Sequence, residues 1–186
     1  TAPKAGYIVP PAFADFIEAR LSTHGIISSK ISKPQALASV EQFHTNTAEL
    51  SAQSFESHQA LKITGQWQKQ DIEIAAGSLY VPIAQAKSAL VMALLEPQAP
   101  DSYLSWGFFN NQFERKEYME DYVAEEVARE MLKDPAIKAE FDAKLAADKA
   151  FAESPQQRLE FFARKHSSWD ERYQVYPVLR TDTKLN

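Results

Sequence analysis

The segment LKITGQWQKQDIEIAAGSLYVPI, residues 61–83, alternates between apolar and polar side chains over most of its length. Successive side chains of a β-strand point to opposite faces of a sheet, so this alternation predicts half-buried strands. The tetrapeptide AAGS around Gly77 predicts a turn between two of these strands. The apolar residues of the pattern are Leu61, Ile63, Trp67, Ile72, Ile74, Leu79, Val81 and Ile83.

The chain before this segment predicts more strands and one helix. Residues 26–60 are rich in Ser, Thr and Gln and show no helical period, and weaker strands are expected near 36–43 and 44–50. Residues 7–9 predict a short strand. Residues 11–24 predict a helix, because Phe13, Phe16, Ile17 and Leu21 recur at steps of three and four. Pro11 suits the first turn of that helix and Gly25 suits its end.

After residue 83 the pattern becomes helical. We expect helices over 86–96, 113–132, 135–147 and 155–165, with Asp134 and Ser154 as N-caps that precede a proline. RYQVYPVLR, residues 172–180, alternates again and predicts a closing strand. The sequence therefore predicts an α+β fold: a small antiparallel β lobe, for which a sandwich is one arrangement, and then a C-terminal helical lobe. The expected divisions are a connector strand and helix (1–25), the β lobe (26–85) and the helical lobe with its closing strand (86–186).

Composition limits the class of protein. Hydrophobic residues make up 45% and charged residues 24% of 186 positions, which is typical of a globular protein. The 20 basic and 25 acidic residues give a charge of −5, without the clustered Lys and Arg that nucleic acid or an anionic membrane requires. The longest apolar run, residues 88–97, is too short for a transmembrane helix. The absence of Cys excludes thiolate chemistry and disulfides. No signal-peptide pattern precedes residue 12, and the missing initial Met favours a processed protein or an excised fragment.

One acidic segment raises the question of a metal site. Residues 105–132, SWGFFNNQFERKEYMEDYVAEEVAREML, contain the carboxylates of Glu114, Glu117, Glu120, Asp121, Glu125, Glu126 and Glu130. Carboxylate-bridged metal sites in helical bundles combine Glu with His, and no His lies between Asp101 and Lys165. The apolar residues form a helical stripe instead: Phe113, Tyr118, Tyr122, Val123, Val127, Met131 and Leu132. We therefore interpret the carboxylates as the solvent face of an amphipathic helix, with Glu125 and Arg129 as an i,i+4 pair worth ~0.3 kcal/mol.

The remaining titratable residues give no catalytic or metal-binding motif. None of the four histidines, His24, His44, His58 and His166, begins a zinc motif. Glu41 and His44 would lie on opposite faces of a strand. Glu56 and His58 would share a face if extended, but two ligands are too few for catalytic zinc. No nucleophile elbow or phosphate loop is present. The sequence thus predicts no catalytic, cofactor-binding or metal-binding residue.

The aromatic and polar residues of two segments are candidates for contact with a partner. Trp106 and Trp169 could present rings to a peptide or a cell-wall glycan, although core packing is the commoner role of such side chains. HSSWDER, residues 166–172, gathers polar groups between a helix and the closing strand. The candidate contact residues are Trp106, His166, Trp169, Asp170 and Arg172.

Three segments, taken in order, carry a family resemblance. They are YIVPPAFADFIEARLSTHGI, then residues 75–132 from AAGSLYVP to AREML, then RLEFFARKHSSWDERYQVYPVLR. Their most specific parts are GSLYVP, LLEP, SWGFFN, EYMEDYVAEEVAREML and WDERYQVYPV. Together they resemble the C-terminal region of bacterial zinc carboxypeptidase-family proteins, which are relatives of carboxypeptidase A.

This resemblance implies a hydrolase parent whose zinc site lies in a preceding catalytic domain. That domain has a His-x-x-Glu pair and a distant His as zinc ligands, and this chain matches none of those motifs. We therefore expect a non-catalytic accessory domain, inactive alone, whose partner is the catalytic domain of the same polypeptide or a second copy. The resemblance also implies a periplasmic or secreted location. The alternatives are a peptide- or glycan-binding module and a self-contained enzyme centred on HSSWDER.

Overall fold

The computed structural model describes residues 2–114 and 119–185. The chain forms two compact units, here called unit 1 (Thr1–Glu114 with Arg172–Asn186) and unit 2 (Arg115–Glu171). The N-terminal strand and helix and the closing strand belong to the same unit as the β lobe. No helix among the described residues has the length and apolar character needed to cross a membrane.

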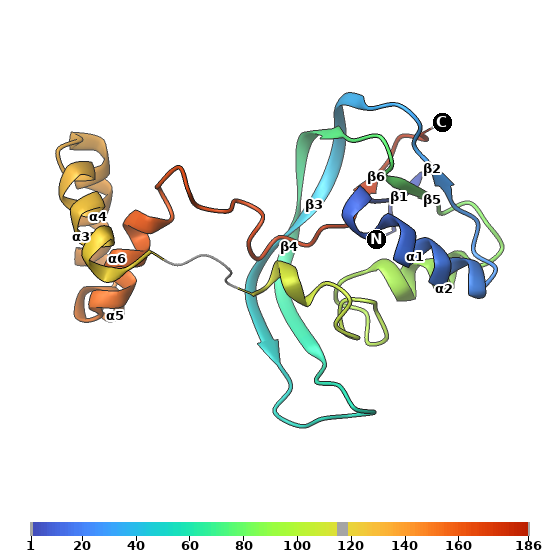
Figure 1. Ribbon diagram of the computed structural model, residues 1–186, viewed down its shortest axis with the longest axis horizontal. Helices are drawn as coiled ribbons and strands as arrows, with labels where there is room; N and C mark the ends of the chain where they lie inside the picture. Colours follow the sequence, from blue (N-terminus) through green and yellow to red (C-terminus); the bar gives the residue numbers. More distant parts are fainter. Residues whose placement is uncertain (1, 115–118, 186) are drawn as a thin grey trace. The chain divides into compact units, whose positions relative to one another are not determined.

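Unit 1 is built on one six-stranded antiparallel sheet with the order β2-β5-β1-β6-β3-β4 (Figure 1). Its strands are β1 Gly6–Val9, β2 Ser29–Lys30, β3 Gln35–Leu50, β4 Leu61–Ile74, β5 Leu79–Pro82 and β6 Leu179–Thr181. The α+β class and the antiparallel pairing are confirmed. All the strands of the described residues join this one sheet, so the sandwich arrangement is not observed.

The two longest strands, β3 and β4, form a hairpin that pairs from Gln35↔Ile74 to Leu50↔Leu61. The two separate strands expected near 36–43 and 44–50 are therefore one strand, which carries irregularities between Gln35 and Ala38 and between Thr45 and Thr47. Each irregularity adds a residue to β3 and breaks its alternation, which makes the strand hard to recognise from sequence.

Both faces of the sheet are covered by apolar side chains. Tyr7, Val9, Leu79 and Val81 point into the larger core, whereas Ile8 and Tyr80 point into a smaller cluster on the opposite face. The larger core also holds the inner side of α1 (Pro11–Thr23), α2 (Ser88–Leu95) and aromatic residues of the segment that follows α2. Helix α1 buries Phe13, Ala14, Ile17 and Leu21, as its periodicity predicts.

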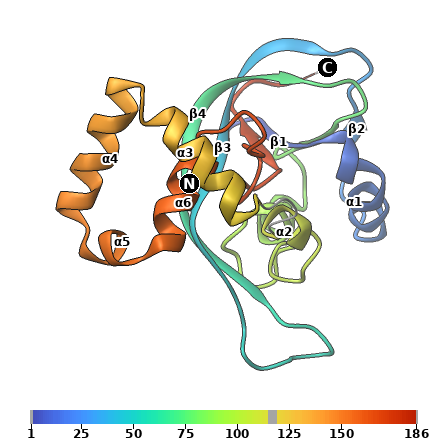
Figure 2. The ribbon, with the colours of Figure 1, turned by 60° about the vertical axis from the view of Figure 1, so that its left-hand side comes forward.

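The described residues of unit 2 form four helices (Figure 2): α3 Asp121–Met131, α4 Pro135–Ala147, α5 Lys149–Glu153 and α6 Pro155–Ala163. The expected caps are confirmed, since the side chain of Asp134 accepts from the Ala136 amide and that of Ser154 from the Gln157 amide. Phe141 lies against Phe151, Phe161 and Phe162 with ring centroids 4.8–5.7 Å apart, and these rings form the centre of the unit's core.

The helix expected over 113–132 is wrong at its start, since the described residues 113, 114, 119 and 120 are not helical. Phe109 is fully buried in unit 1 against Phe13, and a short 3-10 helix η1 (Asn110–Gln112) precedes Phe113. The segment up to Phe113 thus packs in the core of unit 1, while α3 begins at Asp121. Tyr122 was expected in the apolar stripe, but it is exposed because Ala124 and Ala128 face the core. Glu117 and Tyr118 lie outside the described residues.

Candidate functional site

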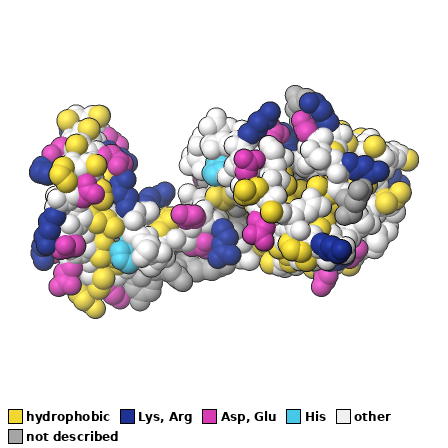
Figure 3. Space-filling model, turned by 90° about the horizontal axis from the view of Figure 1, so that it is seen from above, with side chains coloured by type: hydrophobic (Ala, Val, Ile, Leu, Met, Phe, Trp, Pro, Cys, Tyr) yellow, Lys and Arg dark blue, Asp and Glu magenta, His cyan; other side chains and the backbone are white. Residues whose placement is uncertain are grey.

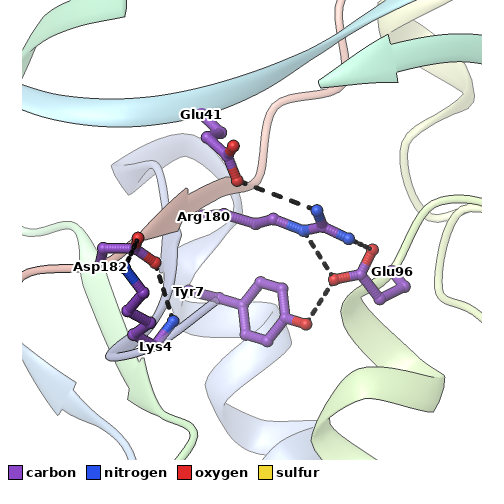
Figure 4. Close-up of polar contacts among 6 residues, drawn as sticks. All are labelled: Lys4, Tyr7, Glu41, Glu96, Arg180 and Asp182. Atoms are coloured by element: carbon purple, nitrogen blue, oxygen red, sulfur yellow. Dashed lines mark hydrogen bonds and ion pairs between the residues drawn. The ribbon is translucent and has the colours of Figure 1, made fainter. Parts of the chain in front are cut away.

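The most buried ionic contact that the structure describes joins Glu96 and Arg180 (Figure 4). Glu96 follows α2, and Arg180 lies in β6. The Arg180 Nε donates to Glu96 Oε1 at 2.9 Å, and Nη2 donates to Oε2. The Arg180 side chain is 12% exposed and the Glu96 side chain is 19% exposed. This two-point geometry matches the planar guanidinium to the planar carboxylate, which makes the contact stronger and more directional than a single charged hydrogen bond.

Tyr7 of β1 completes the cluster from the same face of the sheet. Its hydroxyl donates to Glu96 Oε1 at 2.5 Å. Burial, and then the hydrogen bond to Glu96, raise the pKa of Tyr7 far above its ordinary value. The hydroxyl therefore stays protonated at physiological pH and acts as a donor to Glu96.

Trp67 of β4 and Glu41 of β3 lie around the guanidinium of Arg180. The Arg180 Cζ lies 4.0 Å from the centroid of the Trp67 ring, within the range of a cation–π contact. Glu41 Oε2 lies 3.9 Å from Arg180 Nη1. The guanidinium is therefore held by two carboxylates and one aromatic face.

The sheet register explains how these residues meet. Tyr7 stands opposite Arg180 in the β1–β6 pair, and Arg180 stands opposite Glu41 in the β3–β6 pair. Directly opposed residues of antiparallel strands share a face, so the three side chains form one row. Glu96 reaches this row because α2 ends at Leu95 and Glu96 turns to an extended backbone before Pro97.

This cluster is suited to holding unit 1 together rather than to chemistry on a substrate. Both oxygens of Glu96 accept hydrogen bonds from within unit 1, and Tyr7 is held protonated. The contacts link the end of α2 to β1 and β6. Sequence reasoning missed this site because its members are far apart in the chain and belong to no local motif.

The predicted contact residues divide between the two units. Trp106 is half-buried in unit 1 and stacks on His58, with ring centroids 4.1 Å apart and an interplanar angle of 19°. In unit 2, Arg164 Cζ lies 5.1 Å from the Trp169 ring, and His166 Nδ1 lies 2.8 Å from Ser168 Oγ. Asp170 also belongs to unit 2 and is exposed, while Arg172 begins the returning segment of unit 1.

The extended geometry considered for Glu56 and His58 is wrong. Glu56 and Ser57 have positive φ angles of 47° and 68°, and they form the turn that closes the bridge between Phe55 and His58. His58 instead faces Trp106, a partner that its local spacing did not indicate. Its Nδ1 is buried without a hydrogen-bond partner among the described residues.

Of the described carboxylates of the acidic segment, Glu120 is the N-cap residue of α3 and four lie on it, whereas Glu114 precedes the helix and belongs to unit 1. The four on α3 are Asp121, Glu125, Glu126 and Glu130, and all are exposed. The pair expected between Glu125 and Arg129 is confirmed at 3.0 Å, with both side chains more than half exposed. On the face shown in Figure 3, acidic and basic side chains are interspersed. Within residues 2–114 and 119–185, no group of three or more His, Asp or Glu is arranged to hold a metal ion.

Comparison with known proteins gives no assignment: no family model matches the sequence, and it has no match among curated proteins or solved structures.

Proposed function

We propose that this chain is a non-catalytic accessory domain of a zinc carboxypeptidase-like protein. The observation that carries the proposal is that the three residues of the Glu96–Arg180–Tyr7 cluster come from the three segments of the family resemblance. Tyr7 comes from the first segment of the family resemblance, Glu96 from LLEP in the second and Arg180 from the end of the third. Residues from all three segments of the resemblance thus join separate parts of unit 1 into one core.

In this proposal the chain supports a catalytic domain of the same polypeptide, which holds the zinc ion. This chain stabilises the catalytic domain, shapes the entrance to the cleft of that domain or supports oligomerisation. A periplasmic or secreted location follows from the same resemblance. The cluster favours a supporting role because both carboxylate oxygens of Glu96 and the hydroxyl of Tyr7 form their hydrogen bonds within unit 1.

The test compares this chain with the full-length protein in zinc content and carboxypeptidase activity. We expect the full-length protein to bind zinc and cleave C-terminal residues, and the 186-residue chain to do neither. Arg180→Ala in the full-length protein should lower the thermal stability of the catalytic domain. Arg129→Ala, which removes an exposed ion pair, is the matched control. Stoichiometric zinc or peptide turnover by the chain alone would refute the proposal.

A second candidate, a peptide- or glycan-binding module, is favoured by the stacked pair of Trp106 and His58. Both rings are half-buried, so part of their surface remains open to solvent. Titration with cell-wall glycan fragments or peptides, followed by tryptophan fluorescence, tests this candidate. Binding that Trp106→Ala abolishes and Trp169→Phe leaves intact would favour it over the accessory role.

A further inference from the structure

Strand β4 is an edge of the sheet, since its one neighbour in the strand order is β3. It is 14 residues long, and it contains no proline. At its start, the Leu61 amide donates to the carbonyl oxygen of Ser105 and the Ile63 carbonyl oxygen accepts from the Gln98 side chain. The later part of β4, residues 66–74, offers its row of backbone N–H and C=O groups to another strand. Proteins commonly protect such edges with charged residues, so the arrangement of charge along β4 decides which partner can pair with it.

The second half of β4 carries one basic and two acidic exposed side chains at every second position. Lys69, Asp71 and Glu73 are exposed and lie on one face of the sheet, the face of Trp67. Lys69 stands opposite Glu41, which in turn stands opposite Arg180. The row across the sheet is therefore basic at Arg180, acidic at Glu41 and basic at Lys69, and the next position beyond the edge favours an acidic residue.

We propose that β4 pairs antiparallel with β4 of a second copy of this chain, about a twofold axis at Gln70. In this register Lys69 of each copy lies opposite Asp71 of the other, and Gln70 faces Gln70. The acidic residue that follows Lys69 in the row is then Asp71 of the second copy. Residues 66–74 of both copies pair, and the two sheets become one continuous sheet across the dimer.

The same charges disfavour the neighbouring registers. Directly opposed residues of two strands share a face of the sheet. In a symmetric pair, the twofold axis must therefore lie midway between the two copies of the same β4 residue. Moving the axis to position 69 places Lys69 against Lys69. Moving it to position 71 places Asp71 against Asp71, although Lys69 then faces Glu73. Like charges that are directly opposed destabilise a strand pair, so the register centred on Gln70 is the most favourable of the three.

Charge reversal tests both the dimer and its register by sedimentation equilibrium of the whole chain. Lys69→Glu and Asp71→Lys should each weaken dimerisation roughly tenfold, since each converts two attractive contacts into repulsive ones. The double variant with both changes should restore it. Glu73→Lys is the matched control for Asp71→Lys, because it replaces an acidic residue by Lys on the same face. Residue 73 faces Trp67 in this register, so Glu73→Lys should weaken the dimer far less.

A cysteine cross-link provides an independent test, because the chain has no Cys of its own. Gln70→Cys places two thiols opposite each other at the axis, within reach of a disulfide. Mild oxidation should then give a covalent dimer. Gln66→Cys, whose opposite residue is Ile74, should stay monomeric on a denaturing gel.

Three results would overturn the proposal. The wild-type chain could remain monomeric at high concentration, which would remove the dimer. Glu73→Lys could dissociate the dimer while Asp71→Lys leaves it intact, which would move the axis to position 71, where the two copies of residue 71 carry like charges in either case. Gln66→Cys could cross-link as well as Gln70→Cys, which would indicate random collision. Circular dichroism of each variant confirms that the sheet is intact before its association is compared.

Discussion

Glu96 and Arg180 lie 84 positions apart in the sequence, yet two hydrogen bonds join carboxylate and guanidinium inside unit 1. Strand β6, which carries Arg180, has three residues. All three pair with β1, and Arg180 pairs with Glu41 of β3, so side-chain contacts add to a short backbone pairing. The ion pair thus fixes the returning end of the chain to the end of α2.

Removing the guanidinium should destabilise unit 1 strongly. Arg180→Ala leaves the Glu96 carboxylate largely buried without its ionic partner, and breaking a buried pair in this way costs about 3–5 kcal/mol. Urea unfolding followed by fluorescence measures the effect in a Trp169→Phe background, where Trp67 and Trp106 both report on unit 1. Lys4→Ala, which removes an exposed ion pair with Asp182 in the same unit, should cost far less. Equal losses for the two variants would contradict the structural role of the cluster.

Stability at alkaline pH should depend on Tyr7. Burial and Glu96 raise the pKa of Tyr7 above its ordinary value of 10.0, so the folded state favours the protonated hydroxyl. This contribution is complete below pH 10 and is lost as the pH rises above 10, because the unfolded chain then releases the proton more readily. Tyr7→Phe should reduce that alkaline loss of unfolding free energy, at a cost of about 1 kcal/mol at neutral pH.

Tyr176→Phe is the companion measurement for this pH dependence. The buried hydroxyl of Tyr176 donates to the carbonyl oxygen of Leu95 at 2.9 Å, and burial raises the pKa of Tyr176 as well. Each single variant should remove part of the slope between pH 10 and 11, and the double variant should remove more. An unchanged slope in the double variant would show that other groups control alkaline unfolding.

Gly65 should not tolerate a side chain. A Cβ at this position would overlap the carbonyl oxygen of His44 and would lie 2.7 Å from Cε1 of Phe43. The close approach occurs beside the irregularity of β3 between Thr45 and Thr47. Gly65→Ala should therefore lower the free energy of unfolding by about 2 kcal/mol or more, as overpacking of a tight core site does. Thermal unfolding measures this loss, and Ser39→Ala, on the same hairpin, provides a control.

Periodicity identified the elements whose packing is local. The alternation of residues 61–74 and 79–82 predicted β4 and β5, and Asp134 before Pro135 predicted α4 with its bounds. It failed where tertiary packing changes the pattern. Phe113 was expected in the apolar stripe of the helix over 113–132, but it packs against the core of unit 1. Helix α5 has five residues, too few to establish a period.

The candidate site could not be predicted because nothing local marks it. Glu96 is one of 25 acidic residues, and its partner is identified by the pairing of β1, β3 and β6 rather than by spacing in the sequence. Trp106 was a candidate because of its size, but its partner His58 could not be inferred. His58 ends a turn in which two residues have positive φ angles, and this turn brings it to Trp106. Long-range register of this kind requires the folded sheet.

Unit 1 should fold without unit 2. The chain leaves and re-enters unit 1 at neighbouring points, since the Gln174 amide donates to the carbonyl oxygen of Gln112 at 2.8 Å. A short Gly-Ser linker can therefore replace residues 115–171, and insertions between adjacent chain positions are commonly removable. We expect the shortened chain to keep the unfolding free energy of unit 1 within about 1 kcal/mol, because the Glu96–Arg180 pair and the larger core remain. Near-ultraviolet circular dichroism and urea unfolding measure this. Loss of cooperative unfolding would show that unit 1 depends on the inserted helices.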